Sequence, residues 1–298
     1  MSSQPLEGRR VVVTGAGTGL GSVYAEAIAA AGAAVVVNDI EPDRAAAVAE
    51  RIVRSGGRAI AFAADVSDWE AAGSMIEACV SEFGGIDGLV NNAGILGRLC
   101  PVHEADAGAR NVIDVNVVGT LYPGIHAART MVEAGSAGSI VNVSSGSQCG
   151  QTMYGPYGAS KGAVASLTYG WARDLEDHHV RVNALSPNAW SGQNEEMVRQ
   201  LGYDAEPHIK SHPSKADNAA VVVYLLSDAS RKLSGQVVRV MTGQVTLLTH
   251  PYIVTPGVEL DEFSVETVAT AFDGGGLDQR LQPVGIAAGP APQLELIL

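Results

Sequence analysis

A tyrosine and a lysine four residues apart are the clearest candidates for proton transfer in this chain. Tyr157 and Lys161 lie in the segment YGASK, and their spacing places both on one face of a helix. A phenol has an ordinary pKa of about 10 and is almost wholly protonated at neutral pH. A lysine cation beside it is expected to lower the pKa of Tyr157, which then serves as a general base or, in the reverse direction, a general acid.

A glycine-rich turn follows the first run of β-branched residues. The chain reads TGAGTGLG over residues 14–21, between the expected strand that ends near Thr14 and an alanine-rich stretch that suits a helix. Glycines there let the backbone approach a pyrophosphate, whose charge is stabilised by the free N–H groups at the start of the helix. The position predicts a dinucleotide-binding site.

Asp39 ends the second expected strand, where its carboxylate can accept hydrogen bonds from an adenosine ribose. The same charge would repel a 2′-phosphate, which favours NAD over NADP as the cofactor. Arg44, five residues on, keeps NADP open as the less favoured choice. Asp39 has a second interpretation, as a cap for the helix that begins near Pro42.

Strand and helix patterns alternate along the first 240 residues. The expected strands are Arg10 to Thr14, Val35 to Asp39, Arg58 to Ala63, Gly88 to Asn91, Ser139 to Ser144, Val180 to Leu185 and Gln236 to Val240. The expected helices are Ser22 to Ala31, Pro42 to Ser55, Asp68 to Phe83, Arg110 to Ala134, Gly158 to His178 and Lys215 to Ser227. Valine runs without polar alternation should be buried on both faces. The pattern predicts an α/β doubly wound parallel sheet, the Rossmann fold, in a single domain with a C-terminal extension.

Together these motifs resemble the short-chain dehydrogenase/reductase family of the single-domain type. The glycine-rich segment matches the family pattern TGxxxGxG, Asp65-Val66 resembles the pair that holds the adenine ring, and residues 91–94 read NNAG. The resemblance covers roughly residues 8 to 243. Within the family, the chain looks closest to 3-ketoacyl reductases and to the 3-hydroxyacyl-CoA dehydrogenase part of multifunctional β-oxidation enzymes.

The resemblance implies a set of site residues. The catalytic residues would be Asn116, Ser145, Tyr157 and Lys161, with Asn116 holding a water that links Lys161 to solvent. A helix-interior asparagine satisfied by backbone is the alternative interpretation of Asn116. The cofactor-binding residues would be Gly15, Thr18, Gly19, Leu20, Gly21, Asp39, Asp65, Val66, Asn92, Ala93, Gly94, Tyr157, Lys161 and Pro187.

Two neighbouring serines, Ser144 and Ser145, are candidates for the active serine. In the family it is the second serine of a pair and lies about thirteen residues before the tyrosine. Here the two rules disagree, since Ser144 lies thirteen residues before Tyr157 and Ser145 twelve. We predict Ser145, because the NVSS pattern is tied to the end of a strand whereas the following loop can lose a residue. Its hydroxyl would orient a substrate oxygen and stabilise charge developing on it.

The segment after the sixth expected strand departs from the family pattern. Pro187-Asn188 stands where Pro-Gly is usual, and Ser191 is the best match for the threonine that contacts the carboxamide. Asparagine tolerates positive φ, so the turn can survive. We expect a substrate loop at about 187–214. His208 and His212 have helical ligand spacing but no adjacent glutamate, and Pro213 follows, so no metal site is predicted.

Composition excludes several classes of protein. A formal net charge of −13 argues against a nucleic-acid binder, which needs clustered basic residues. No apolar run approaches the length of a membrane span, and the N-terminus lacks the apolar core of a signal peptide. The three cysteines, Cys79, Cys100 and Cys149, show neither paired nor metal-ligand spacing, which fits a reducing cytoplasm.

The domain prediction assigns residues 1–243 to the cofactor-binding domain and 244–298 to an extension. The extension is proline-rich, with one plausible helix around Glu262 to Phe272, and ends in the apolar segment LELIL. These leucines predict packing on the domain or on a neighbouring subunit. The family often forms dimers or tetramers through the helices that carry Tyr157 and Asn116, so a homodimer or homotetramer is expected.

The main hypothesis is an NAD-dependent oxidoreductase that interconverts a secondary alcohol and a ketone by hydride transfer. The alternative is an NAD-binding sensor or scaffold without turnover, favoured only by the altered Pro187-Asn188 stretch. The small-molecule substrate stays open among an acyl thioester, a steroid-like alcohol and a natural-product alcohol.

Overall fold

The computed structural model of the chain describes residues 4–190, 198, 212–251, 253–262, 264–273, 277, 280 and 285. Backbone contacts divide the chain into two compact units, Met1–Leu248 and Thr249–Leu298. In the described part of the second unit the one helix is α10 (Val265–Asp273), close to the helix expected from the sequence. No helix of the described residues is long and apolar enough to cross a membrane.

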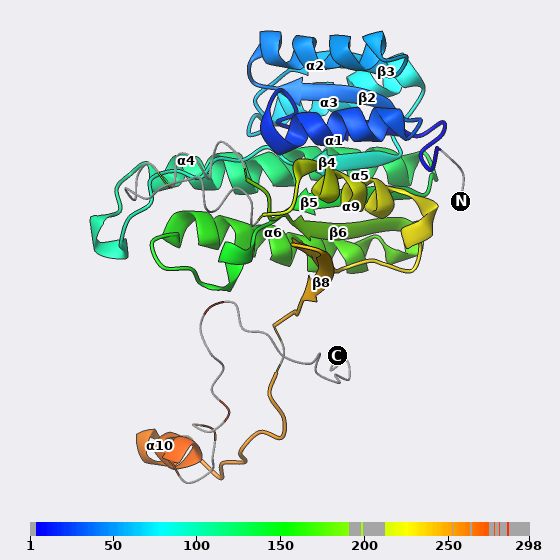
Figure 1. The fold of residues 1–298 in the computed structure, drawn as a ribbon. Helices are drawn as coiled ribbons and strands as arrows, with labels where there is room; N and C mark the ends of the chain where they lie inside the picture. Colours follow the sequence, from blue (N-terminus) through cyan, green and yellow to red (C-terminus); the bar gives the residue numbers. More distant parts are fainter. Residues whose placement is uncertain are drawn as a thin grey trace. The chain divides into compact units, whose positions relative to one another are not determined.

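The first unit is built on one eight-stranded sheet whose strand order is β3-β2-β1-β4-β5-β6-β7-β8 (Figure 1). The strands are β1 (Arg10–Val13), β2 (Ala34–Asp39), β3 (Arg58–Ala63), β4 (Gly88–Asn91), β5 (Gly138–Val143), β6 (Val180–Ser186), β7 (Val237–Met241) and β8 (Gln244–Leu248). The first seven strands in chain order pair in parallel, and β8 pairs antiparallel to β7. The predicted doubly wound parallel sheet is confirmed.

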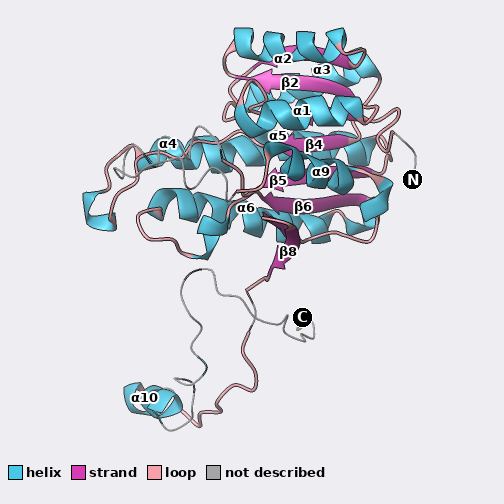
Figure 2. Ribbon diagram, viewed as in Figure 1, coloured by secondary structure: helices cyan, strands magenta, loops and turns pink. Residues whose placement is uncertain are grey.

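Helices cover both faces of this sheet (Figure 2). They are α1 (Gly19–Ala30), α2 (Pro42–Arg54), α3 (Trp69–Phe83), α4 (Ala109–Ile113), α5 (Gly119–Glu133), α6 (Gly155–Asp174) and α9 (Lys215–Leu226). Local signals explain several helix starts: Pro42 occupies the first turn of α2, Asp68 accepts a hydrogen bond from the Ala71 N–H, and Ser214 begins α9 with a capping box.

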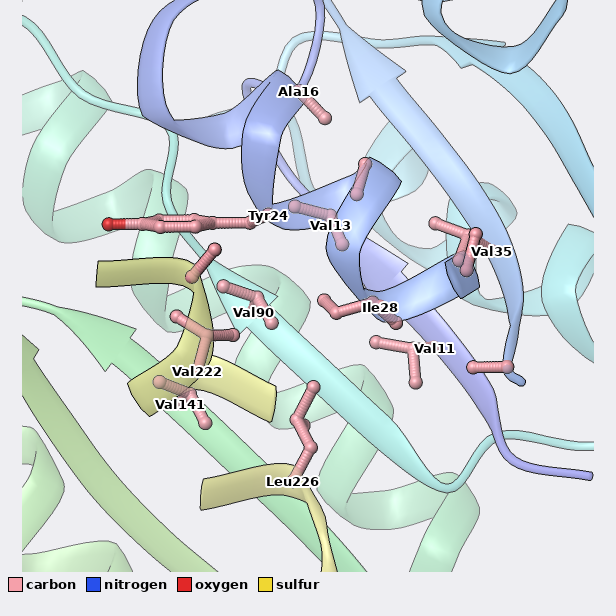
Figure 3. Close-up of a cluster of buried hydrophobic side chains, with 14 of the residues drawn as sticks. Val11, Val13, Ala16, Tyr24, Ile28, Val35, Val90, Val141, Val222 and Leu226 are labelled. Atoms are coloured by element: carbon pink, nitrogen blue, oxygen red, sulfur yellow. The ribbon is translucent and has the colours of Figure 1, made fainter. Parts of the chain in front are cut away.

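Two apolar clusters hold the helix layers to the sheet. One cluster joins α1, α2 and α9 to the strands and includes Tyr24, Ile28 and Val222 (Figure 3). The other joins α3, α5 and α6 to the opposite face and includes Met75 and Met131. Both faces of β1 and β2 are therefore buried, as their unbroken valine runs predicted.

The eighth strand was not predicted. Thr242 and Gly243 form a two-residue turn, in which Gly243 has a φ of 69° that suits glycine. The turn pairs Met241 with Gln244 and folds Gln244–Leu248 back along β7. The sequence analysis counted these five residues with the extension, because their alternation of apolar and polar residues is too short to indicate a strand by itself.

The helical stretch expected over Arg110 to Ala134 is interrupted. Between α4 and α5 the backbone forms a π-helical segment, η2 (Asp114–Val118). Segments of this kind insert one residue into an α-helix and occur often at functional sites. Asn116 lies in the middle of η2 and is fully buried.

Candidate active site

A cleft of about 570 Å³ lies at the carboxyl ends of the parallel strands. It is placed where β1 neighbours β4, the point at which the chain order across the sheet reverses. Open α/β sheets bind ligands at such a point. Every predicted cofactor-binding residue lines this cleft: Gly15, Thr18, Gly19, Leu20, Gly21, Asp39, Asp65, Val66, Asn92, Ala93, Gly94, Tyr157, Lys161 and Pro187.

The start of α1 is built to receive an anion. Thr18 precedes the helix without donating or accepting a capping hydrogen bond through its side chain, and the first turn contains no acidic residue. The free N–H groups of that turn therefore stay available. Gly19 has a φ of 64° and open space around the position of a Cβ, whereas a Cβ at Gly21 would collide with the carbonyl oxygen of Gly15. This cradle fits a pyrophosphate group.

Asp39 lies at the adenosine end of the cleft and is 8% exposed. Its carboxylate accepts hydrogen bonds from the Gly17 N–H at 2.9 Å and the Glu41 N–H at 3.1 Å. The N-cap of α2 is Glu41, so Asp39 does not cap that helix. Arg44 lines the same cleft and has an exposed side chain.

Asn92 and Thr14 tie the glycine-rich turn to the end of β4. The Asn92 side chain donates to the carbonyl oxygens of Thr14 and Gly15, at 2.9 Å and 3.0 Å. The Thr14 hydroxyl accepts in return from the N–H groups of Asn92 and Ala93. The sequence analysis quoted Thr14 within the motif but gave it no role. Its hydrogen bonds fix the turn against a strand seventy-odd residues away.

Tyr157 lines the cleft, and its side chain is hydrogen-bonded to that of Ser145. The Ser145 oxygen also accepts from the Ser147 N–H at 3.2 Å and from the Ser147 hydroxyl at 3.0 Å, so the Ser145 hydroxyl proton is the one donated to the Tyr157 oxygen. Ser144 also lines the cleft, but its hydroxyl has other partners. Its hydroxyl contacts Gln148 Oε1 at 2.7 Å and the Lys161 carbonyl oxygen at 3.0 Å.

Burial sets the protonation of Tyr157 and Lys161. It raises the pKa of Tyr157 to about 12, with the Ser145 hydrogen bond acting in the opposite direction. Burial also lowers the pKa of Lys161 to about 8. Lys161 Nζ lies 5.7 Å from the centre of the Tyr157 ring and donates to the Val143 carbonyl oxygen at 2.8 Å. In the protein chain alone, burial therefore raises the pKa of Tyr157, and the lowering expected from Lys161 does not offset it.

Asn116 connects the catalytic helix to the loop after β4. Its Oδ1 accepts from the Ile95 N–H at 2.8 Å, and its Nδ2 lies 2.9 Å from the Ile95 carbonyl oxygen. The same Nδ2 donates to the Ser160 hydroxyl at 3.0 Å, and Ser160 donates to the Tyr157 carbonyl oxygen at 2.7 Å. Sequence reasoning missed Ser160. Its position one turn after Tyr157 is the signal that could have identified it.

Pro187-Asn188 differs from the Pro-Gly that is usual in the family, but the backbone at these residues is ordinary. Asn188 does not adopt a positive φ, and its N–H donates to Asn218 Oδ1 at 3.2 Å. Ser191 and His208 lie outside the described residues, as does most of the predicted substrate loop at 187–214. Among the residues that the structure describes, no three His, Cys, Asp or Glu side chains gather as they would around a metal ion.

Comparisons with known proteins agree with this geometry. A family model described as short chain dehydrogenase matches residues 9–200. A 2,5-dichloro-2,5-cyclohexadiene-1,4-diol dehydrogenase from Sphingobium indicum is 36% identical over 240 residues, which cover 77% of this chain and 94% of the relative. Among solved structures, a short chain dehydrogenase from Mycobacterium avium has a TM-score of 0.79 at 30% identity, covering 94% of this chain and 97% of that one. A gluconate 5-dehydrogenase from Burkholderia cenocepacia in complex with NADP and tartrate has a TM-score of 0.73 at 31% identity, covering 81% and 97%.

Proposed function

The chain belongs to the short-chain dehydrogenase family and is an oxidoreductase that acts on CH–OH groups; on that premise we propose that it interconverts a secondary alcohol and a ketone with NAD. The observation that carries the proposal is the Tyr157–Ser145 hydrogen bond at the end of a dinucleotide-sized cleft that Lys161 also lines. A nicotinamide dinucleotide held there would accept or donate the hydride.

Each catalytic side chain has a distinct task in this proposal. Tyr157 accepts the proton of the alcohol in oxidation and returns it in reduction. With substrate bound, Ser145 turns its hydroxyl proton from Tyr157 to the substrate oxygen and holds that oxygen beside the Tyr157 hydroxyl. When protonated, Lys161 stabilises negative charge on Tyr157.

Asn116 and Ser160 have positioning roles. Their hydrogen bonds link the loop after β4 to the Tyr157 backbone and keep the phenol in place over the cleft. We keep the proposal, from the family resemblance, that Asn116 holds a water that would connect Lys161 to solvent.

Asp39 supports NAD as the cofactor. A 2′-phosphate at the adenosine end would approach a buried carboxylate, and each of the Asp39 oxygens already accepts a backbone N–H. Arg44 is the feature that favours NADP, since an exposed guanidinium on the same cleft can pair with a phosphate. The buried, hydrogen-bonded position of Asp39, compared with the exposed side chain of Arg44, supports our proposal of NAD.

The substrate proposed is a secondary alcohol carried on a ring, supported by the likeness to the cyclohexadiene-diol dehydrogenase. The likeness to 3-ketoacyl reductases remains a prediction, and a surface with a net charge of −13 disfavours a polyanionic thioester. We further propose a cytoplasmic protein that forms homodimers or homotetramers through the helical segments that carry Tyr157 and Asn116. The C-terminal extension would pack on the domain or on a neighbouring subunit.

The test is turnover by the wild type and by Tyr157→Phe, with Tyr169→Phe on the same helix as the matched control. NADH formation is followed with cyclic and open-chain secondary alcohols and with 3-hydroxyacyl thioesters, using NAD and NADP side by side. We expect Tyr157→Phe to lower kcat by about 10²–10⁴-fold while dinucleotide binding persists. Tyr169→Phe should stay near the wild type. Equal activity of wild type and Tyr157→Phe would contradict the proposal.

A further inference from the structure

The turn after β5 contains a buried serine beside the proposed active one. Ser145 precedes the short helical turn η3 (Gly146–Cys149), and Ser147 lies inside it. Ser145 is half-buried, whereas Ser147 is only 3% exposed. A hydroxyl with so little access to water finds its hydrogen-bond partner inside the protein. For the Ser147 hydroxyl that partner is the side chain of Ser145.

Ser147 donates two hydrogen bonds to one oxygen. Its N–H lies 3.2 Å and its hydroxyl 3.0 Å from Ser145 Oγ. The bond from the N–H is the ordinary one for a serine that begins a helical turn. The bond from the hydroxyl satisfies no backbone group of the turn, so capping does not account for it. Its effect falls on the Ser145 side chain alone.

The turn η3 lies directly against the helix that carries Tyr157. Gly158 follows Tyr157 in α6, and a Cβ there would lie 2.9 Å from the Ser147 carbonyl oxygen. Two backbones come this close only where one of them has no side chain. A further hydrogen bond joins the Ser144 hydroxyl to Gln148 Oε1 at 2.7 Å. The position of Ser147 is therefore fixed relative to both the end of β5 and Tyr157.

We propose that Ser147 is a positioning residue of the dehydrogenase site, which fixes the direction of the Ser145 hydroxyl proton. A serine oxygen has two acceptor positions, and the two donors of Ser147 occupy both. The Ser145 proton is then held toward Tyr157 in the free protein and toward the substrate oxygen when substrate is bound. The proposal rests on the proposed function, in which Ser145 contacts the substrate oxygen.

Ser147 also strengthens Ser145 as a donor. A hydroxyl that accepts hydrogen bonds donates a stronger one, because each bond in a chain polarises the next. The hydrogen bond from Ser145 lowers the pKa of Tyr157 against the effect of burial. A weaker Ser145 donor would lower that pKa less, so loss of the Ser147 hydroxyl should raise the pKa of Tyr157.

The titratable side chains on the segments around the Tyr157 phenol are unchanged by substitution at Ser147. They belong to α6, to the residue before it, to η3, to α4 and to η2, and are Lys161, Tyr154, Cys149, Arg110 and Asp114. Lys161 Nζ lies 5.7 Å and the Tyr154 ring centre 6.1 Å from the centre of the Tyr157 ring. A serine carries no charge itself, so a shifted pH profile reports the path from Ser147 to Tyr157.

The test compares Ser147→Ala with Ser139→Ala in the full-length protein. Ser139 lies near the start of β5, is 1% exposed and donates its hydroxyl to the Leu225 carbonyl oxygen at 2.8 Å. Each variant loses one buried hydroxyl, so both should be destabilised to a similar extent. Ser147→Ala alone should lower kcat for alcohol oxidation by about two- to tenfold, with an unchanged KM for NAD. Its kcat/KM profile should move to higher pH by roughly half a unit.

Three further variants separate positioning from structural support. Ser147→Thr keeps the hydroxyl and should restore kcat and the pH profile. In the Ser145→Ala protein, adding Ser147→Ala should change kcat no further, because Ser147 acts through Ser145. Ser147→Cys has nearly the same shape and a weaker donor, and it replaces the alanine variant if that protein does not fold.

Wild-type kcat and pH profile in Ser147→Ala or Ser147→Cys would overturn the proposal, since stability would then be the only property that the hydroxyl supports. Equal kinetic changes in Ser139→Ala would overturn it as well. The proposed function is read separately, from the loss of turnover in Tyr157→Phe. Failure of the positioning role is therefore distinguishable from failure of the dehydrogenase mechanism.

Discussion

Two adjacent serines have opposite environments. The oxygen of Ser145 accepts two hydrogen bonds from Ser147 and faces Tyr157, whereas the hydroxyl of Ser144 is 1% exposed and contacts Gln148 and the Lys161 backbone. These hydrogen bonds support our proposal that Ser145 is the side chain that reaches a substrate oxygen. Ser144 supports the strand end on which Ser145 lies.

Alanine substitutions separate these two roles. Ser145→Ala should lower kcat by about 10²–10³-fold, because it removes a donor to the developing charge. Ser144→Ala should leave kcat within a few-fold of wild type and lower the free energy of unfolding by about 1 kcal/mol. Steady-state kinetics and urea unfolding of both variants check the prediction. The reverse pattern would assign the active hydroxyl to Ser144.

The pKa of Tyr157 predicts opposite pH dependences for the two directions of reaction. Burial raises it to about 12, so the phenol is protonated in nearly every molecule at neutral pH. Oxidation needs Tyr157 to accept a proton, and kcat/KM for the alcohol should rise about tenfold per pH unit below the effective pKa. Reduction needs the proton in place, so its rate should fall at alkaline pH. Rates measured in both directions across the same pH series check this, and parallel profiles would contradict it.

Most of the cleft could be predicted from the sequence because its residues occupy local motifs. The glycine-rich turn and the NNAG segment each follow directly from a strand end, so position along the chain also places them in space. Thr14 and Ser160 were missed because their partners, Asn92 and Asn116, are distant in sequence. The raised pKa of Tyr157 depends on how deeply several elements bury it, which no spacing reveals.

At the scale of elements, the turn between β1 and α1 has an unusual backbone conformation and also lines the proposed cofactor cleft. Gly19 and Gly56 both have positive φ, 64° and 85°, and open space where a Cβ would lie. Gly19 lines the cleft, while Gly56 follows the end of α2. The two positions therefore share a backbone conformation and differ in what lies next to them.

Alanine at these two glycines should cost similar stability but different affinity. Each substitution forces a Cβ into the left-handed region, at about 1–2 kcal/mol of unfolding free energy. Gly19→Ala also places a methyl group in the cradle at the start of α1, which should raise the Kd for NADH by roughly tenfold or more. Fluorescence titration with NADH and thermal unfolding of both variants provide the measurements. An equal Kd in the two variants would show that the turn does not hold the cofactor.

The elements that the sequence did not reveal are those fixed by contacts between distant segments. Strong caps and valine runs predicted the helices and the parallel strands within a few residues. The π-helical segment at Asp114–Val118 interrupts a stretch with good helical periodicity, and Asn116 within it bonds to Ile95 of a separate loop. Strand β8 exists because a two-residue turn sets it against β7, and its own pattern is too short to indicate this.

At the scale of the whole molecule, the cleft and the complete sheet lie within Met1–Leu248. A chain that ends at Leu248 should therefore unfold cooperatively and bind NADH like the full-length protein. Calorimetry and NADH titration check this, with the full-length chain as reference. Loss of cooperative unfolding on removal of residues 249–298 would show that the extension is part of the folding unit.

The place of α9 beside α1 has a consequence for biosynthesis. These helices share one apolar cluster, in which Val222 and Leu226 lie with Tyr24 and Ile28 (Figure 3), yet five strands are translated between them. At about 5–20 residues per second, the ribosome completes α9 roughly ten to forty seconds after α1. During that interval the nascent chain exposes one side of the helix that begins at the phosphate cradle. Chaperones that bind apolar helices would have this surface available on every newly made copy until α9 covers it.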